Sequence, residues 1–306
     1  MRQVKIAQRI SDNFADGFNK FLLILKEFRK LENNEPIELD FSKCIFLTPF
    51  FLLPLAVLIQ QERLKRDVII IKNEFNVQFN SYLDYILFER GLIPEEIENE
   101  DFQARLIPYE SKTYIPIINF PSKRENNPTL IRDKIMNVLN SILRIQLNLS
   151  GGFRTAIIYL LDESINNIVD HSDAERGFVF AQYFPNRLFI DICIVDNGKS
   201  ILGSYLQNGV KVASDIDAIN LAINGKSTKK DKEHERGFGI RTSNNMLVSG
   251  MKGKYLLYSG KAIFIKTVDK QEIIEIPDEL HWLGTIVALR IPYFGDNQFD
   301  PTPYYE

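Results

Sequence analysis

The first third of the chain carries two hydrophobic periods, one typical of helices and one typical of strands. Residues 11–31 repeat phenylalanine and leucine at i, i+3 and i+4 spacing, which predicts an amphipathic helix with Ser11 or Asp12 as its N-cap. Residues 35–41 alternate apolar and polar side chains, as a half-buried strand does. Residues 68–71 are a short branched apolar run, which predicts a buried strand.

A nearly continuous apolar run at residues 44–59 raises the question of a membrane segment. The run is shorter than the ~20 residues that a transmembrane helix needs, and Pro49 and Pro54 interrupt it. It predicts instead a buried strand–turn–helix segment that ends in the charged residues 60–66. A further helix is expected over residues 80–89. Strands and helices that alternate at this spacing indicate parallel pairing, with helices packed on the sheet.

The residues from 96 to 128 have a different composition. They contain an acidic run and several prolines, which disfavour a packed core, so we expect them to connect two halves of the chain. Residues 115–120 have the pattern of a short edge strand. The second half is richer in long apolar segments. Its expected elements are helices over 130–149, 157–171, 215–224 and 241–248, a break at 151–152, and strands over 177–183, 188–195, 255–258, 262–266 and 285–291.

Three polar side chains share one stripe of the expected helix that ends near residue 171. Glu163, Asn167 and His171 are four residues apart, so they lie one above the other beside a buried apolar face. A carboxylate can polarise a water molecule and an amide oxygen can hold a hard cation, so the stripe would suit a nucleotide–metal site. Taken alone, the stripe is equally consistent with an ordinary solvated helix edge.

Two glycine turns later in the chain favour the nucleotide site. The strand at 188–195 ends in Asp196 and in a turn where Gly198 permits close backbone approach. Further on, the Gly-Phe-Gly sequence at 237–239 opens a helix, and the free N–H groups and positive dipole of a helix start can bind an anion. The acid-amide helix, the Asp-x-Gly turn and the Gly-x-Gly helix start occur here in this order.

With these motifs the chain resembles the GHKL ATPases, which share the Bergerat ATP-binding fold. The matching motifs are the N box at 163–167, the first glycine box at 196–198, the second glycine box at 237–239 and the Gly-Thr pair at 284–285 before the last strand. The resemblance covers about residues 130–295 and is nearest to the anti-sigma-factor serine kinases. One departure is Ser200, which stands where the first box usually has its second glycine.

The resemblance implies an α/β (α+β) fold, with a C-terminal two-layer α/β sandwich of Bergerat type, a mixed sheet, and ATP and Mg²⁺ bound under a lid. Asp196 would accept a hydrogen bond from the adenine amino group, Asn167 would bind Mg²⁺, and Glu163 would be the catalytic base. Residues of the lid and of the second box would contact the phosphates. The residues expected to bind ATP are Asn167, Asp196, Gly198, Lys226, Thr228, Lys229, Arg236, Gly237, Phe238, Gly239, Ile240 and Thr285.

Residues 30–95 resemble a STAS domain, the small α/β module of anti-sigma antagonists. The resemblance depends on residues 39–48 and on the apolar helix that follows them. STAS antagonists carry a phosphorylatable serine or threonine where that helix starts, and Thr48 lies near that place, although a capping or packing role would also explain Thr48. The expected domains are a small STAS-like α/β domain at 1–110, a linker at 111–128 and a GHKL-type ATP-binding domain at 129–306.

Composition narrows the expected partners and compartment. The 306 residues have a formal net charge of −3, which gives no indication of nucleic-acid binding. Cys44 and Cys193 are the only cysteines and lie in apolar segments, as core residues of a reducing compartment do. The first residues lack the apolar core of a signal peptide. We therefore expect a cytoplasmic protein without a membrane or nucleic-acid partner, which binds ATP and either a protein partner or a second copy of itself.

The motifs leave more than one ATP chemistry open. The presence of Glu163 favours a Mg-ATP-binding regulatory ATPase or serine/threonine protein kinase that is controlled by, or acts through, the STAS-like part. A histidine kinase would need a phosphoaccepting histidine on the helix before the ATP domain, and residues 130–149 contain none. The alternatives are a non-catalytic, nucleotide-gated interaction module and an ATP-driven dimerising clamp.

Overall fold

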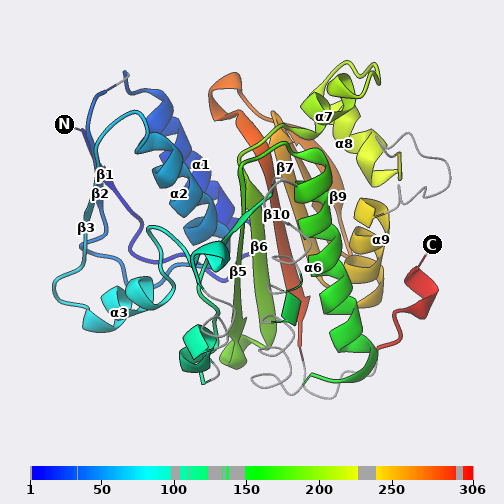
Figure 1. Ribbon diagram of the computed structural model, residues 1–306, viewed down its shortest axis with the longest axis horizontal. Helices are drawn as coiled ribbons and strands as arrows, with labels where there is room; N and C mark the ends of the chain where they lie inside the picture. Colours follow the sequence, from blue (N-terminus) through cyan, green and yellow to red (C-terminus); the bar gives the residue numbers. More distant parts are fainter. Residues whose placement is uncertain are drawn as a thin grey trace.

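The computed structural model has an α+β architecture in which helices separate two sheets (Figure 1). A three-stranded parallel sheet lies at one side, two helices lie beside it, and a seven-stranded antiparallel sheet follows, with more helices on its far face. The structure describes residues 2–32, 34–97, 104–109, 111–122, 149–226, 239–293 and 299–305, together with Asp133, Met136 and Asn137.

The small sheet confirms the parallel pairing that the first third of the sequence predicts. Its order is β1-β2-β3, and both neighbouring pairs are parallel. The hydrophobic pattern does not predict β1, because a single buried side chain marks this four-residue strand. Helix α3 begins and ends a few residues before its predicted range. The elements are β1 (Arg2–Lys5), α1 (Asp16–Arg29), β2 (Ile37–Asp40), α2 (Pro49–Glu62), β3 (Val68–Ile71) and α3 (Val77–Tyr85).

The large sheet has the order β4-β5-β6-β10-β7-β8-β9, and every neighbouring pair in it is antiparallel. The prediction of a mixed sheet is therefore wrong. Strands β6 and β7 run in the same direction, but β10 lies between them and pairs with both, so no parallel neighbours remain. The strands are β4 (Ile118–Pro121), β5 (Arg176–Phe184), β6 (Phe189–Asp196), β7 (Lys254–Gly260), β8 (Ala262–Lys266), β9 (Gln271–Glu275) and β10 (Trp282–Pro292).

The helices of the second half cover one face of this sheet. The expected edge strand near residues 115–120 is present as β4, whereas the mostly exposed strand β9 has no apolar face to predict it. Residues 151–152 begin helix α6 after Ser150, so the glycine pair is part of this helix. The helix expected over 130–149 falls mostly outside the described residues. The helices are α6 (Gly151–His171), α7 (Ile201–Gln207), α8 (Asp215–Ile223) and α9 (Gly239–Asn245), which continues into a π-helical turn (Met246–Gly250).

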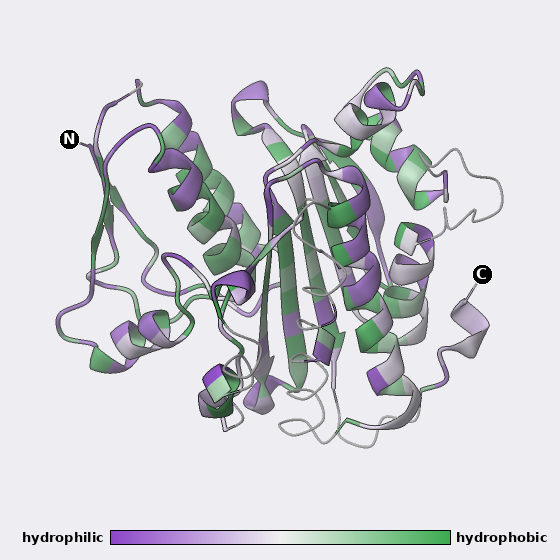
Figure 2. Ribbon diagram, viewed as in Figure 1, coloured by the Kyte–Doolittle hydropathy of each residue, from purple (hydrophilic) through white to green (hydrophobic). Residues whose placement is uncertain are grey.

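Helices α1 and α2, which lie outside the segment expected to form the two-layer sandwich, cover the opposite face of the large sheet (Figure 1). Every residue of α2 from 49 to 59 is buried, because the helix lies between the two sheets. A helix that is hydrophobic all round is normally buried in this way. The apolar run at 44–59 is thus explained by the two sheets between which α2 lies (Figure 2). No helix in the described ranges has both the length and the apolar character that a membrane span requires.

Most of the buried apolar side chains form one large cluster from Val4 to Tyr293, and a small second cluster contains Tyr205, Ala218 and Ala222. The large cluster includes Ile115 and Ile117, which fall in the expected linker, so this segment contributes to the core. Strand β6 is buried on both faces and explains the continuity: Ile194 lines a cavity under α6, whereas Asp191 lies on the α1 and α2 side. The division into residues 1–110, 111–128 and 129–306 stays a prediction.

An ion pair is buried on the α1 and α2 side of the sheet. Arg290 of β10 donates from Nε and Nη2 to the two carboxylate oxygens of Asp191, each at 2.7 Å, and from Nη1 to the main-chain oxygen of Asp12. The guanidinium carbon lies 3.9 Å from the ring centroid of Phe189. Burial raises the pKa of Asp191 to about 6, and the hydrogen bonds from Arg290 oppose that rise, so the pair is ionised at neutral pH.

Removal of one partner of this pair is expected to destabilise the fold more than removal of both. Arg290→Met leaves a buried carboxylate without its donors, and we expect a loss of about 3–5 kcal/mol in unfolding free energy at pH 7 by urea denaturation. The loss becomes smaller at lower pH, because the unpaired Asp191 then binds a proton. The double variant Asp191→Leu/Arg290→Met recovers most of the stability. An Arg290→Met variant as stable as the parent would contradict the expected cost of leaving the buried Asp191 carboxylate without its donors.

Candidate functional site

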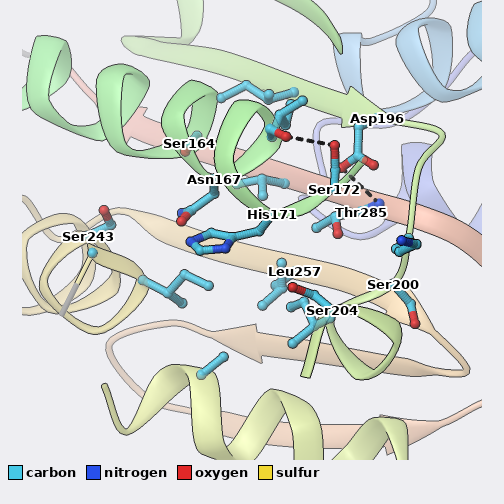
Figure 3. Close-up of a pocket in the computed structure, with 18 of the residues that line it drawn as sticks. Ser164, Asn167, His171, Ser172, Asp196, Ser200, Ser204, Ser243, Leu257 and Thr285 are labelled. Carbon is cyan, nitrogen blue, oxygen red and sulfur yellow. Dashed lines mark hydrogen bonds between the residues drawn. The ribbon is translucent and has the colours of Figure 1, made fainter. Parts of the chain in front are cut away.

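One cavity brings together predicted site residues from five separate segments (Figure 3). It lies between α6, the start of α9, the α7–α8 segment and the front face of β6, β10 and β7. Its volume is about 110 Å³, and one water molecule needs only ~10–15 Å³ by the same measure, so the cavity has room for a much larger group. The predicted residues that line it are Asn167, Asp196, Lys226, Gly239, Ile240 and Thr285.

Asp196 is the one acidic residue among the described residues that line the cavity, and 1% of its surface is exposed. Its Oδ1 accepts a hydrogen bond from the Gly198 N–H at 2.9 Å, and its Oδ2 accepts one from the Thr285 N–H at 3.1 Å. Burial raises the pKa of Asp196 to about 7, although the two backbone hydrogen bonds act in the opposite direction and favour the ionised form. No ion pair to Asp196 occurs among the described residues, so within them only N–H groups stabilise the ionised form of this carboxyl.

The start of β10 is shaped around Asp196. The pairing of β10 with β7 shifts register between Trp282 and Thr285, which is the mark of a β-bulge. The bulge contains Gly284, where an added Cβ would overlap the main-chain oxygen of Asp196, so a larger residue cannot occupy this position without moving the strand. The Gly-Thr pair thus allows the close approach that places the Thr285 N–H on the carboxylate.

The turn after Asp196 accounts for Ser200, which stands where the glycine box that this segment resembles usually has its second glycine. A Cβ at Gly198 would overlap the main-chain oxygen of Ser172, so this glycine is required by close packing against the end of α6. Ser200 has an extended backbone and is the N-cap of α7, where its Oγ accepts a hydrogen bond from the Gly203 N–H at 3.1 Å. A capping serine therefore suits this position, because the chain enters a helix here.

The polar stripe of α6 faces the cavity for part of its length. Asn167 and His171 both line it, one helical turn apart, as their spacing predicts (Figure 3). Glu163 lies one turn earlier and is not among the lining residues. It is close to the start of α9, because a Cβ at Gly239 would overlap the Glu163 carboxylate. The three side chains therefore extend from the cavity to the helix start opposite.

The expected phosphate-binding loop is only partly described. Lys226 lines the cavity before the loop, and Gly239 and Ile240 line it after the loop. The remaining predicted residues lie outside the described residues, so their positions are not compared with the prediction; they are Thr228, Lys229, Arg236, Gly237 and Phe238.

The cavity also contains residues that the motifs do not indicate. Ser243 is 4% exposed, it lines the cavity, and its Oγ has no hydrogen-bond partner among the described residues. It lies across from Asn167 (Figure 3). Helical spacing from Gly239 would have identified it, since residues four apart share a face. Apolar side chains form much of the remaining wall; they include Ile168, Ile194, Ile201, Leu257 and Val287.

The possible metal ligands that line the cavity fit Mg²⁺ only if the ion binds together with a nucleotide. No cluster of three or more histidine, cysteine or acidic side chains suited to a metal occurs among the described residues. Asn167 offers one neutral oxygen to the cavity. Mg²⁺ is commonly bound by one or two protein ligands together with water and substrate phosphates, so this sparse set fits a metal that arrives with a nucleotide.

Thr48 lies at the predicted place in the small sheet's layer, as the N-cap of α2. It is 3% exposed, and its Oγ1 has no hydrogen-bond partner among the described residues. A Cβ at Gly17 of α1 would lie 2.5 Å from this oxygen, so the hydroxyl is packed against α1. Phosphorylation of Thr48 stays a prediction, and it would require α1 to move.

Comparison with known proteins does not identify the chain. No protein-family model matches it, and no curated protein sequence matches it. The function is therefore inferred from the residues of the cavity.

Replacement of Asp196 by asparagine should change how stability depends on pH. The carboxyl has a pKa of about 7 in the fold and an ordinary value of 3.8, so the native state binds the proton more tightly and the parent loses stability as pH rises from about 4 to about 7. Asp196→Asn removes this loss, so its stability relative to the parent rises by up to about 1.4 kcal/mol per pH unit in that window. Urea denaturation between pH 4 and pH 8 measures both slopes, and parallel slopes would contradict the burial of this charge.

Proposed function

We propose that the chain is a GHKL-type protein that binds Mg-ATP in the cavity between α6, β6 and α9, and transfers the terminal phosphoryl group to water or to a protein hydroxyl. The observation that supports this most directly is the convergence of Asn167, Asp196, Gly239 and Thr285 on one cavity, in the arrangement that the resemblance implies. These residues come from distant parts of the sequence, so their meeting is not a consequence of local chain geometry.

Base recognition follows from the state of Asp196. Each carboxylate oxygen has two lone pairs, and Gly198 and Thr285 use one on each oxygen, so acceptor capacity remains. A buried carboxylate without a cation is costly unless another donor reaches it. The exocyclic amino group of adenine is such a donor, and the apolar wall around it can contact the faces of the ring. A guanine would present a carbonyl oxygen at the equivalent edge, so the site favours adenine.

The phosphates would extend from the base toward Asn167 and the start of α9. Gly239 and Ile240 at the start of α9 line the cavity, where backbone N–H groups of a helix start can bind phosphate, and Lys226 supplies a positive charge. The hydroxyl of Ser243 lies on the same side of the cavity as α9 and is a further donor. Asn167 would hold the Mg²⁺ that accompanies the nucleotide, and the metal would neutralise phosphate charge when bound.

Glu163 is positioned for proton transfer beside the phosphate end. Its carboxylate lies next to Gly239, where the resemblance places the second glycine box. A carboxylate at that position can accept the proton of an attacking water or hydroxyl, while the surrounding N–H groups and Lys226 hold the phosphate oxygens. The protein thus orients the nucleophile and stabilises charge.

Asn167→Ala should abolish Mg-ATP binding, because it removes the only predicted protein ligand of the metal. Isothermal titration calorimetry in the presence of Mg²⁺ measures the affinity. The matched control is Asn166→Ala, since Asn166 donates to Asp162 at 3.1 Å and does not line the cavity. The control variant should bind like the parent. Unchanged affinity in Asn167→Ala would remove the proposed metal site.

Glu163→Gln should keep Mg-ATP binding and lose turnover by about 10²-fold or more, because only the proton acceptor is removed. The parent is incubated with γ-labelled ATP, alone and with cell lysate. Label on a protein indicates a kinase, free phosphate indicates an ATPase, and binding without either indicates a nucleotide-gated interaction module. Asp162→Asn, on the neighbouring position of α6, is the control. Full transfer by Glu163→Gln would exclude Glu163 as the base.

A further inference from the structure

Trp282 connects Asp196 with the helical layer on the opposite face of the sheet. It is the only tryptophan of the chain and is 1% exposed. Its indole Nε1 donates a hydrogen bond to the main-chain oxygen of Asp196 at 3.0 Å. The same ring packs edge-on against Phe21 of α1, with the two ring centroids 5.8 Å apart and an interplanar angle of 74°. One side chain therefore contacts both the cavity's acid and α1.

A second aromatic contact strengthens the link between α1 and the sheet. Phe18 of α1 packs edge-on against Tyr258 of β7, with ring centroids 5.3 Å apart. The Tyr258 hydroxyl donates to the main-chain oxygen of Leu280, two residues before Trp282. Buried aromatic pairs of this kind contribute specific geometry as well as buried area. Two phenylalanines of α1 thus fix the segment that leads into β10.

Polar contacts join the same two segments. Arg29 of α1 donates from Nη2 to the main-chain oxygen of His281 at 3.0 Å. Lys26 and Glu279 form an ion pair at 3.7 Å. Both pairs are exposed, so they add little stability, but they define the position of α1 relative to the segment before β10.

The bulge at the start of β10 transmits this position to the carboxylate. Trp282 and Thr285 flank the bulge, and both donate to Asp196: the indole to its main-chain oxygen and the Thr285 N–H to its Oδ2. A shift of Trp282 would therefore move two of the hydrogen-bond donors that orient Asp196. Close-packed interiors transmit such shifts because they contain little free volume.

We propose that Trp282 is a positioning residue through which the packing of α1 on the sheet sets the affinity of the cavity for nucleotide. This inference rests on the proposed Mg-ATP site. Coupling between two sites is reciprocal, so a partner that binds the N-terminal layer and shifts α1 would change nucleotide affinity, and nucleotide would change the affinity for that partner by the same factor.

The full chain is tested first without mutation. Calorimetry measures Mg-ATP binding, and the emission of Trp282 is recorded over the same titration. We expect the emission to change with the same apparent dissociation constant as the binding heat, because the indole donates a hydrogen bond to the main-chain oxygen of Asp196. An absence of heat and of emission change would overturn the proposed function itself. Binding heat with an unchanged emission would leave the proposed function intact and overturn the inference.

Phe21→Leu then tests whether α1 contributes. Phe28→Leu is the matched control, because Phe28 is buried on the same helix and no ring contact joins it to Trp282. We expect Phe21→Leu to weaken Mg-ATP binding by about five-fold or more and to shift the emission of Trp282, while Phe28→Leu, at equal loss of stability, binds like the parent. Equal affinities in both variants would overturn the proposal.

Trp282→Phe provides a second, independent variant. It keeps an aromatic ring against Phe21 and removes the N–H donor to Asp196. We expect weaker Mg-ATP binding together with a changed pH dependence of binding, since the removed donor orients Asp196 through its main-chain oxygen. A role in stability alone would move neither. A folded Trp282→Phe protein that binds Mg-ATP with the parent's affinity and pH profile would overturn the proposal.

Discussion

The cavity is organised around the buried carboxylate of Asp196, which is paired with no cation in the part of the chain that the structure describes. Among the described residues, Asp196 receives only N–H donors: two from the backbone to its carboxylate and one from an indole to its main-chain oxygen. Burial of a charge in this way works against stability, which is why its pKa lies near 7. Folds keep such unfavourable groups mainly where they serve a site. The bulge, the glycine at 284 and the turn at 198 are all arranged to permit this one burial.

The buried acids on the two faces of the large sheet have different hydrogen-bond partners. On the α1 and α2 side, Asp191 is neutralised by a bidentate arginine, and the pair is enclosed by aromatic rings. On the cavity side, Asp196 retains unused acceptor capacity. The two acids are on the same strand, five residues apart and therefore on opposite faces. The difference separates a group that holds layers together from one that is available to a ligand.

The separate motifs of the candidate site could be predicted from sequence because each is local, whereas their meeting in one cavity depends on the whole fold. The four-residue spacing on α6 and the Asp-x-Gly turn each specify a geometry without distant partners, and Asn167 and Asp196 do face one cavity. The fold's layering could not be predicted, because it depends on which strand inserts between β6 and β7 and on what covers the far face of the sheet. The all-round apolar character of α2 indicates that protein covers the helix on every side, but it does not indicate which elements do so. Ser200 gives a second example. It departs from the glycine-box motif because it is the N-cap of α7, a helix that the hydrophobic pattern does not predict.

The central place of β10 in the large sheet also bears on the order in which the protein can fold. This strand comes late in the sequence, yet it separates β6 from β7 and carries partners of both buried acids. During synthesis, β5 and β6 would emerge as a hairpin with one edge still open, and α2 would have only part of its eventual surface. Non-local pairing of this kind slows folding and leaves apolar edges exposed for longer. The nascent chain would therefore depend on protection from aggregation until the segment from Trp282 onward has left the ribosome.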